Sequence, residues 1–104
     1  QVQYSDIFYN LGAKTMLIKI YVETDEKEAL LSLIASFTIY LKRNKKIASN
    51  IKQTYLNFTS LIYKILKAKP YQLATIREEI RTIPLLTDRR WLLTISKLSK
   101  KTTK

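Results

Sequence analysis

Residues 17–37 read LIKIYVETDEKEALLSLIASF and predict two helices joined by a short acidic turn. Apolar residues recur at three- and four-residue spacing on both sides of the turn, which is the period of an amphipathic helix. Thr24 is the expected N-cap of the second helix, because Asp25 and Glu26 follow it where a helix dipole favours negative charge. The stretch therefore predicts a helical hairpin.

The composition extends this prediction to the whole chain. One Gly and two Pro among 104 residues leave few helix breakers, so long helices are favoured over a sheet with many tight turns. The absence of Cys and His excludes a disulfide framework and removes the commonest metal ligand. No apolar run approaches the roughly 18 residues that a membrane-spanning helix needs, so we expect a cytoplasmic protein that does not enter the membrane.

Five helices are predicted from their apolar stripes. Ser5 and Asp6 are possible caps of the first helix, and Thr87 or Asp88 is the expected cap of the fifth. Pro70 ends the third helix and can open the fourth, and Pro84 stops the fourth. The five stripes are Phe8, Leu11, Thr15, Ile18, Val22; Leu30, Leu33, Ile34, Phe37, Leu41; Ile47, Ile51, Tyr55, Phe58, Ile62, Ile65; Leu73, Ile76, Ile80, Ile83; and Trp91, Leu92, Ile95, Leu98.

The basic run at residues 40–46, YLKRNKK, is interpreted as the joint between the second and third helices. Lys42 and Arg43 occupy the last helical turn, where cations complement the unpaired carbonyl groups. Asn44 is the expected left-handed C-cap.

The number of apolar faces on each helix predicts how the helices pack. The first helix has a second apolar face, made by Tyr9, Ala13, Met16 and Ile20, and the third has one made by Leu56, Thr59 and Tyr63. The second and fourth helices have one apolar face each. This pattern favours stacked antiparallel hairpins over a plain four-helix bundle, in which each helix would need one stripe.

The predicted architecture is a single all-α domain of about five helices over residues 1–99. Its parts are hairpins at 6–43 and 47–83 and a capping helix at 88–99, followed by a disordered basic tail at 100–104. Because the sequence begins without Met, we expect the chain to be part of a longer helical protein.

Residues 17–37 also resemble the helix–turn–helix of a tetratricopeptide-like repeat. Tyr21 matches an aromatic position of that family, Ala29 a small position after the turn, and Phe37 a later aromatic position. Ile18 departs from the pattern, since the family has glycine there, and the turn is one residue short. More loosely, the chain resembles the C-terminal helical part of uncharacterised proteins from Bacteroidota. The resemblance to the repeat family implies contact with proteins and no catalytic residue.

Catalysis and metal binding have no support in the residue pattern. Because the sequence has no His or Cys, it lacks the usual general base that activates a Ser or Thr nucleophile. Gly12 is the one glycine, and it makes no phosphate-binding loop by itself. Acidic residues cluster around the first turn, but helix-dipole complementarity explains them without a cation: Glu23, Asp25, Glu26 and Glu28. We therefore expect a non-enzymatic protein without a cofactor or bound metal.

Polyanion binding is the alternative function. The net charge is +11, and no acid occurs between Glu28 and Glu78. Such a field attracts nucleic acid or other polyanions, although a solvated helix face has the same composition. The candidate residues for this function are Lys46, Lys52, Tyr63, Lys64, Lys67 and Arg77.

The preferred prediction is a protein–protein interaction or scaffold module. The expected partner surface is the second face of the first helix, Tyr9, Ala13, Met16 and Ile20. It would meet a protein partner, upstream helical repeats of the same chain, or a second copy in a homodimer. Trp91 follows Arg89 and Arg90 and could be an interface anchor, but packing of the last helix onto its neighbour is the favoured interpretation.

Overall fold

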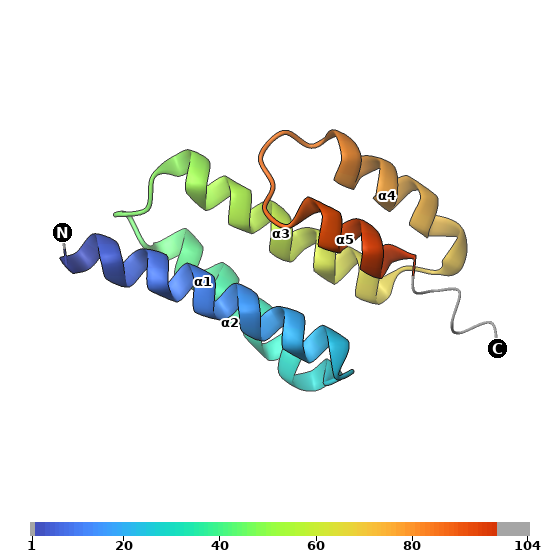
Figure 1. The fold of residues 1–104 in the computed structure, drawn as a ribbon, viewed down its shortest axis with the longest axis horizontal. Helices are drawn as coiled ribbons and strands as arrows, with labels where there is room; N and C mark the ends of the chain where they lie inside the picture. Colours follow the sequence, from blue (N-terminus) through green and yellow to red (C-terminus); the bar gives the residue numbers. More distant parts are fainter. Residues whose placement is uncertain (1, 98–104) are drawn as a thin grey trace. The chain divides into compact units, whose positions relative to one another are not determined.

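The computed structural model describes residues 2–97, with side chains from Asp6 onward, and it confirms an all-α chain with five α-helices in this range. The chain divides into two compact units at the bond between Ile47 and Ala48, here named unit 1 and unit 2. The elements are α1 (Val2–Glu23), α2 (Lys27–Arg43), α3 (Ser49–Lys67), the 3₁₀ turn η1 (Pro70–Gln72), α4 (Leu73–Thr82) and α5 (Arg89–Ser96) (Figure 1).

Unit 1 is a hairpin in which α1 and α2 lie side by side and run in opposite directions (Figure 1). The predicted stripe of α1 is confirmed at Leu11, Thr15 and Ile18, which are buried. The Thr15 hydroxyl donates to the Leu11 carbonyl at 2.7 Å, so its burial leaves no unsatisfied donor. On α2 the buried side chains are Leu30, Ile34, Phe37 and Leu41, as the sequence predicts.

The N-terminal part of α1 differs from the prediction in two ways. The helix begins at Val2, so Ser5 and Asp6 lie within it and the prediction that they cap it is wrong. Phe8 is exposed and Ile7 is buried in its place. The reason is geometric: Ile7 lies about 40° from Leu11 around the helix axis, whereas Phe8 lies about 60° from Leu11 in the opposite direction, at the edge of the buried face.

The turn between α1 and α2 also corrects the sequence prediction. The Thr24 hydroxyl donates to the Ile20 carbonyl at 2.8 Å, so Thr24 completes the last turn of α1 instead of capping α2. The N-cap of α2 is Glu26, which makes no side-chain capping hydrogen bond. Asp25 has a left-handed backbone with φ of 59°. An aspartate in this region allows the chain to reverse without glycine.

The joint after α2 lacks the predicted left-handed cap. Asn44 is the C-cap, but its backbone is extended, with φ of −84° and ψ of 102°. Its side-chain Oδ1 accepts a hydrogen bond from the Lys46 backbone N–H at 3.0 Å, which stabilises the extended turn. Because α3 begins only at Ser49, the buried Ile47 belongs to this joint and not to the third helix.

Unit 2 packs α3, α4 and α5 against one another, with η1 leading into α4. Its buried apolar side chains are Phe58, Leu61 and Ile62 of α3, Leu73, Ile76 and Ile80 of α4, and Leu92 and Ile95 of α5. The rings of Phe58 and Trp91 lie 6.2 Å apart, which confirms that Trp91 packs the last helix onto a neighbour.

Two arginines hold the α4–α5 region together. Arg77 on α4 donates through Nη1 to the Leu93 carbonyl at 2.7 Å and to Ser96 Oγ at 3.0 Å. Arg89 at the start of α5 donates to the carbonyls of Ile80 and Ile83 at 2.6 and 2.8 Å, where α4 ends.

Asp88 is the N-cap residue of the fifth helix, as predicted, but its backbone is left-handed with φ of 58° and its side chain makes no capping hydrogen bond. The last two residues of the predicted helix at 88–99, which include Leu98, and the predicted tail at 100–104 lie outside the described residues.

Candidate functional site

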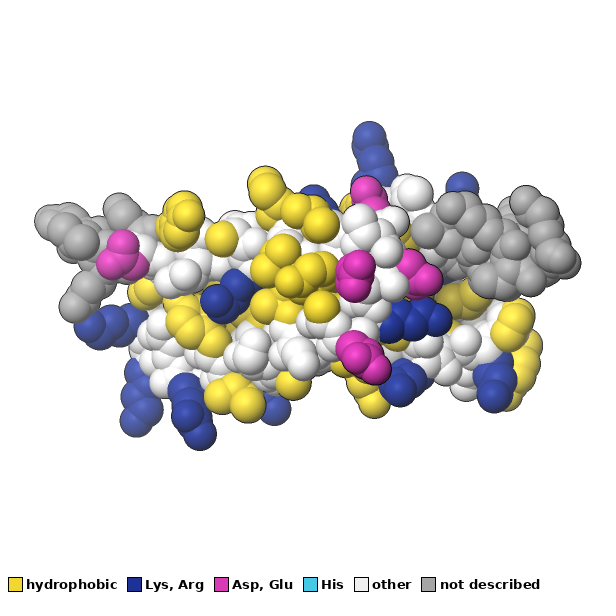
Figure 2. Space-filling model, turned by 90° about the horizontal axis from the view of Figure 1, so that it is seen from below, with side chains coloured by type: hydrophobic (Ala, Val, Ile, Leu, Met, Phe, Trp, Pro, Cys, Tyr) yellow, Lys and Arg dark blue, Asp and Glu magenta, His cyan; other side chains and the backbone are white. Residues whose placement is uncertain are grey.

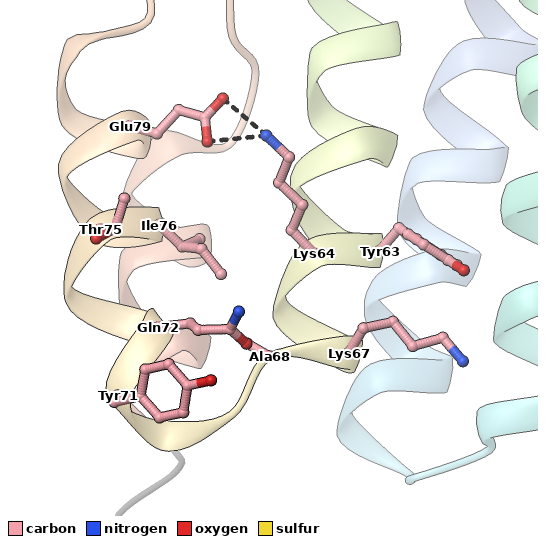
Figure 3. Close-up of a pocket in the computed structure, with 9 residues that line it drawn as sticks. All are labelled: Tyr63, Lys64, Lys67, Ala68, Tyr71, Gln72, Thr75, Ile76 and Glu79. Carbon is pink, nitrogen blue, oxygen red and sulfur yellow. Dashed lines mark hydrogen bonds and ion pairs between the residues drawn. The ribbon is translucent and has the colours of Figure 1, made fainter.

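An open groove of about 550 Å³ lies in unit 2 between the C-terminal half of α3, η1 and the N-terminal half of α4. Figure 3 shows the two helices as its walls and η1 joining them at one end. The groove exists because Lys69-Pro70 breaks the helix and η1 then starts α4 at a distance from α3. It is lined by Tyr63, Lys64, Lys67, Ala68, Tyr71, Gln72, Thr75, Ile76 and Glu79.

An ion pair crosses the groove at the end away from η1. Lys64 Nζ lies 3.0 and 3.1 Å from the two carboxylate oxygens of Glu79 and so connects α3 to α4 (Figure 3). The side chains are 46% and 39% exposed, so water screens the pair and its net contribution to stability is small. The ammonium group of Lys64 is thus placed in the groove without being buried there.

Gln72 supplies the groove with an oriented amide. Its Oε1 accepts a hydrogen bond from the Lys69 backbone N–H at 2.7 Å. Because a backbone N–H requires an acceptor, this contact assigns the oxygen and leaves the two N–H donors of Nε2 on the other side. In Figure 3 the Gln72 nitrogen lies in the space between α3 and α4. The groove therefore contains a fixed hydrogen-bond donor on the η1 side of the Lys64–Glu79 ion pair.

Two tyrosines and a second lysine form the rim. Tyr71 of η1 is 78% exposed and Tyr63 of α3 is 48% exposed. The Lys67 Nζ lies 5.7 Å from the centroid of the Tyr63 ring, within the range of a cation–π contact. Tyr63 and Lys67 extend from α3 away from α4, whereas Lys64 extends toward α4 (Figure 3).

The groove unites only part of the predicted polyanion site. Tyr63, Lys64 and Lys67 line it together, but Lys52 and Arg77 do not. Arg77 is part-buried and directed at acceptors on α5, so its charge serves the packing of unit 2. Lys46 belongs to unit 1, where it lines a shallow pocket with Asp6, Ile7, Asn10, Tyr40 and Asn44.

The predicted partner surface of α1 is exposed along its whole length. The exposed fractions are 75% for Tyr9, 63% for Met16 and 47% for Ile20, and Ala13 is exposed as well. A Cβ atom placed on the neighbouring Gly12 would have no atom within 4 Å.

In the space-filling view, hydrophobic side chains gather in patches at the surface, with Asp and Glu side chains close together over one stretch (Figure 2).

Several groove residues were not identified from the sequence. These residues come from η1 and α4: Tyr71, Gln72, Thr75 and Glu79. They are distant in sequence from the α3 residues that they meet, and Lys64 and Glu79 are fifteen residues apart. The signal that could have found them was the Lys69-Pro70 break, which predicts a change of chain direction directly beside exposed polar and aromatic residues.

The groove residues can contact a ligand through charge, stacking and hydrogen bonds. Within residues 2–97, no group of three or more acids lies close enough to hold a metal ion, and the acidic turn of unit 1 is included in that statement. Across the same residues, no helix has the length and apolar content that a membrane span requires. Lysines, tyrosines and an amide can bind an anionic or aromatic ligand through charge, stacking and hydrogen bonds.

Comparisons of this chain with protein-family models, with curated proteins and with solved structures each found no match.

Proposed function

We propose that the chain is a non-enzymatic interaction module that binds an amphipathic helix of a protein partner on the outer face of α1. The observation that carries the proposal is that α1 is apolar on two opposite sides. One side is buried through Leu11 and Ile18, and the other exposes Tyr9, Met16 and Ile20. Exposed apolar side chains gathered on one face are typical of a surface that another protein covers.

The spacing of the exposed face favours a helix as the partner. Tyr9, Ala13, Met16 and Ile20 follow one another at intervals of four, three and four residues, which is the seam used in helix–helix packing. Asp6 and Glu23 continue this spacing at the two ends, so charge limits the apolar seam to about three turns of helix.

Small residues at and beside the middle of the seam support the same assignment. Gly12 and Ala13 are adjacent, and the space beside Gly12 is open. A second helix can therefore approach the backbone of α1 closely at this point, with its larger side chains beside the two small residues. The resemblance of residues 17–37 to a tetratricopeptide-like hairpin is consistent with this proposal, because such hairpins pack helix faces against neighbouring helices.

Site-specific crosslinking in the native cell tests the proposal. A photoreactive amino acid replaces Tyr9, and in a matched control it replaces Ile39, which is half exposed on α2. We expect crosslinks from position 9 that map to one amphipathic helix of a partner and that Met16→Glu abolishes. Equal crosslinking from both positions, or crosslinks that persist in Met16→Glu, would contradict the proposal. Crosslinks to the chain itself, with a doubled mass in sedimentation, would identify a second copy in place of a different protein.

A further inference from the structure

The α3–η1–α4 groove of unit 2 is separate from the α1 face and has chemistry that the proposed function does not use. We propose that this groove binds a single-stranded nucleic-acid segment, with one base stacked on Tyr71 and the adjoining phosphates paired with Lys64 and Lys67. The site is made of residues of unit 2 alone, so the inference does not depend on the partner of α1.

The size and floor of the groove suit a nucleotide unit. Its volume of about 550 Å³ lies within the range of roughly 300–1,000 Å³ in which small-molecule units bind to proteins. Ile76 is buried at 8% exposure and Ala68 is half-buried, so the floor is apolar. An apolar floor with a few polar groups at its edge accommodates a flat base and leaves its phosphate at the rim.

The aromatic residues provide stacking platforms at two separate places. Tyr71 stands on η1 at one end of the groove, and Tyr63 extends from the opposite side of α3 (Figure 3). Both rings are exposed, at 78% and 48%, so a base can reach them without displacing core side chains. Because the two rings do not face each other, they fit successive bases of a strand better than one base held between them.

The two cations lie on opposite sides of α3: Lys64 extends toward α4, and Lys67 lies beside Tyr63 (Figure 3). Lys64 keeps one carboxylate partner, Glu79, but its ammonium group has three N–H donors and is 46% exposed, so a phosphate oxygen can share it. Lys67 lies 5.7 Å from the Tyr63 ring, where a phosphate beside a stacked base would be placed. Glu79 is the one acid among the groove residues, and Lys64 neutralises it. The charge of the groove therefore complements an anion.

The polar groups add contacts to the base. Gln72 Nε2 is held in the groove as a donor, because Oε1 is fixed by the Lys69 N–H. A donor at this place matches the carbonyl oxygens of uracil, thymine, cytosine or guanine. Thr75 lines the groove as well.

A single-stranded nucleic acid explains these features better than a fatty acid or an acidic peptide does. A fatty acid needs a long apolar channel, and the groove is open with Ala68 and Ile76 as its floor. An acidic peptide would satisfy the lysines but would make no use of two exposed tyrosine faces and an oriented amide donor. Within unit 2, no acid precedes Glu78 in the sequence, so α3 and η1 carry only basic charges beside the groove.

Fluorescence anisotropy with a dye-labelled oligouridylate of about 10 nucleotides tests the proposal, a length within the roughly 4–16 nucleotides that one OB-fold covers. The full chain is titrated at low salt and again at about 0.2 M salt. We expect Tyr71→Ala to weaken binding roughly tenfold, as for loss of one stacked base. We expect Lys67→Gln to weaken binding and to lower the salt slope by about 0.7, which is the value for one phosphate contact on a single strand.

Two matched variants control for exposure and charge. Tyr9→Ala removes an equally exposed tyrosine from unit 1, and Lys27→Gln lowers the net charge by the same amount outside the groove. Both should bind like the unmodified chain. Far-ultraviolet circular dichroism confirms that each variant keeps its helices, so that a loss of binding is not a loss of fold.

Three results would overturn the proposal. One is that Tyr71→Ala binds as tightly as the unmodified chain, or that Tyr9→Ala loses as much affinity. Another is that heparin, a polyanion without bases, competes as well as the oligonucleotide at equal charge and that its binding ignores Tyr71→Ala. The third is that uridine monophosphate competes as tightly as the strand, which would make the site a mononucleotide pocket. None of these results changes the crosslinking expected from the face of α1.

Discussion

Arg77 on α4 and Leu93 on α5 are joined by a hydrogen bond of 2.7 Å from the guanidinium to the backbone carbonyl. The same Nη1 donates to Ser96 Oγ, which is buried in α5. Arg77, which was predicted from the sequence to bind a polyanion, thus bridges two short helices.

Replacement of Arg77 by methionine should destabilise unit 2. The carbonyl of Leu93 and the hydroxyl of Ser96 lose a charged donor in a part-buried place, and hydrogen bonds to charged groups contribute about 1.5–3 kcal/mol. We expect the free energy of unfolding in urea to fall by about 2 kcal/mol. Arg81→Met is the control, because Arg81 pairs with Glu78 on the same exposed helix surface and should cost less than about 0.5 kcal/mol. Equal losses for the two variants would contradict the bridging role.

Replacement of Phe37 by alanine should strongly destabilise unit 1. Phe37 is fully buried at 0% exposure on α2, so its removal leaves a cavity and costs about 3–5 kcal/mol. Ile39→Ala on the same helix removes a half-exposed side chain and should change the unfolding free energy by about 0.5 kcal/mol or less. Urea unfolding followed by circular dichroism measures both, and similar midpoints would show that the buried face of α2 is assigned wrongly.

Asp25 should tolerate glycine and reject a β-branched residue. Its φ of 59° lies in the left-handed region, which glycine adopts freely and valine does not. We expect Asp25→Val to lower the unfolding free energy by about 1–2 kcal/mol relative to Asp25→Gly. Thermal melts of the two variants provide the comparison. If valine is tolerated as well as glycine, the turn between α1 and α2 does not require a left-handed residue at this position.

Asn57 should anchor the segment between α4 and α5. Its Nδ2 donates to the Leu85 carbonyl at 2.8 Å, and its Oδ1 accepts from Gln53 Nε2 at 2.8 Å. Asn57→Ala should cost about 1 kcal/mol and speed the hydrogen exchange of amides near Leu85. Asn50→Ala, at an exposed position of the same helix, should leave those exchange rates unchanged. A uniform acceleration across unit 2 in Asn57→Ala would mean that the contact supports the whole core and not this segment.

The helices could be predicted from the sequence because apolar periodicity reports which face of a helix is buried. Leu11, Ile18, Phe37 and Ile80 are buried as their spacing predicts. Cap residues were less predictable, because a local hydrogen bond can compete with a cap. Thr24 bonds back to the Ile20 carbonyl, and Asn44 bonds forward to the Lys46 N–H.

The two candidate sites also differ in how far the sequence predicts them. The exposed seam of α1 follows from periodicity within one helix, so Tyr9, Met16 and Ile20 are exposed as the partner-surface prediction requires. The groove depends on which residues of α3 and α4 meet, and periodicity does not contain that information. Arg77 shows the limit most clearly. The sequence pattern of a long cationic side chain is the same whether its charge lies in water or pairs with a carbonyl on another helix, as that of Arg77 does.

The contact of Arg89 with the end of α4 has a consequence for how unit 2 opens. The carbonyls of Ile80 and Ile83 receive their hydrogen bonds from a residue that begins the next helix. α4 has 10 residues and α5 has 8, and both are shorter than the roughly 12–15 residues that an isolated helix needs in water. Each helix therefore depends on its packing, and the hydrogen bonds of Arg77 and Arg89 make the two depend on each other. In native-state hydrogen exchange the two helices should behave as one foldon, whose amides exchange through a single shared opening with one free energy.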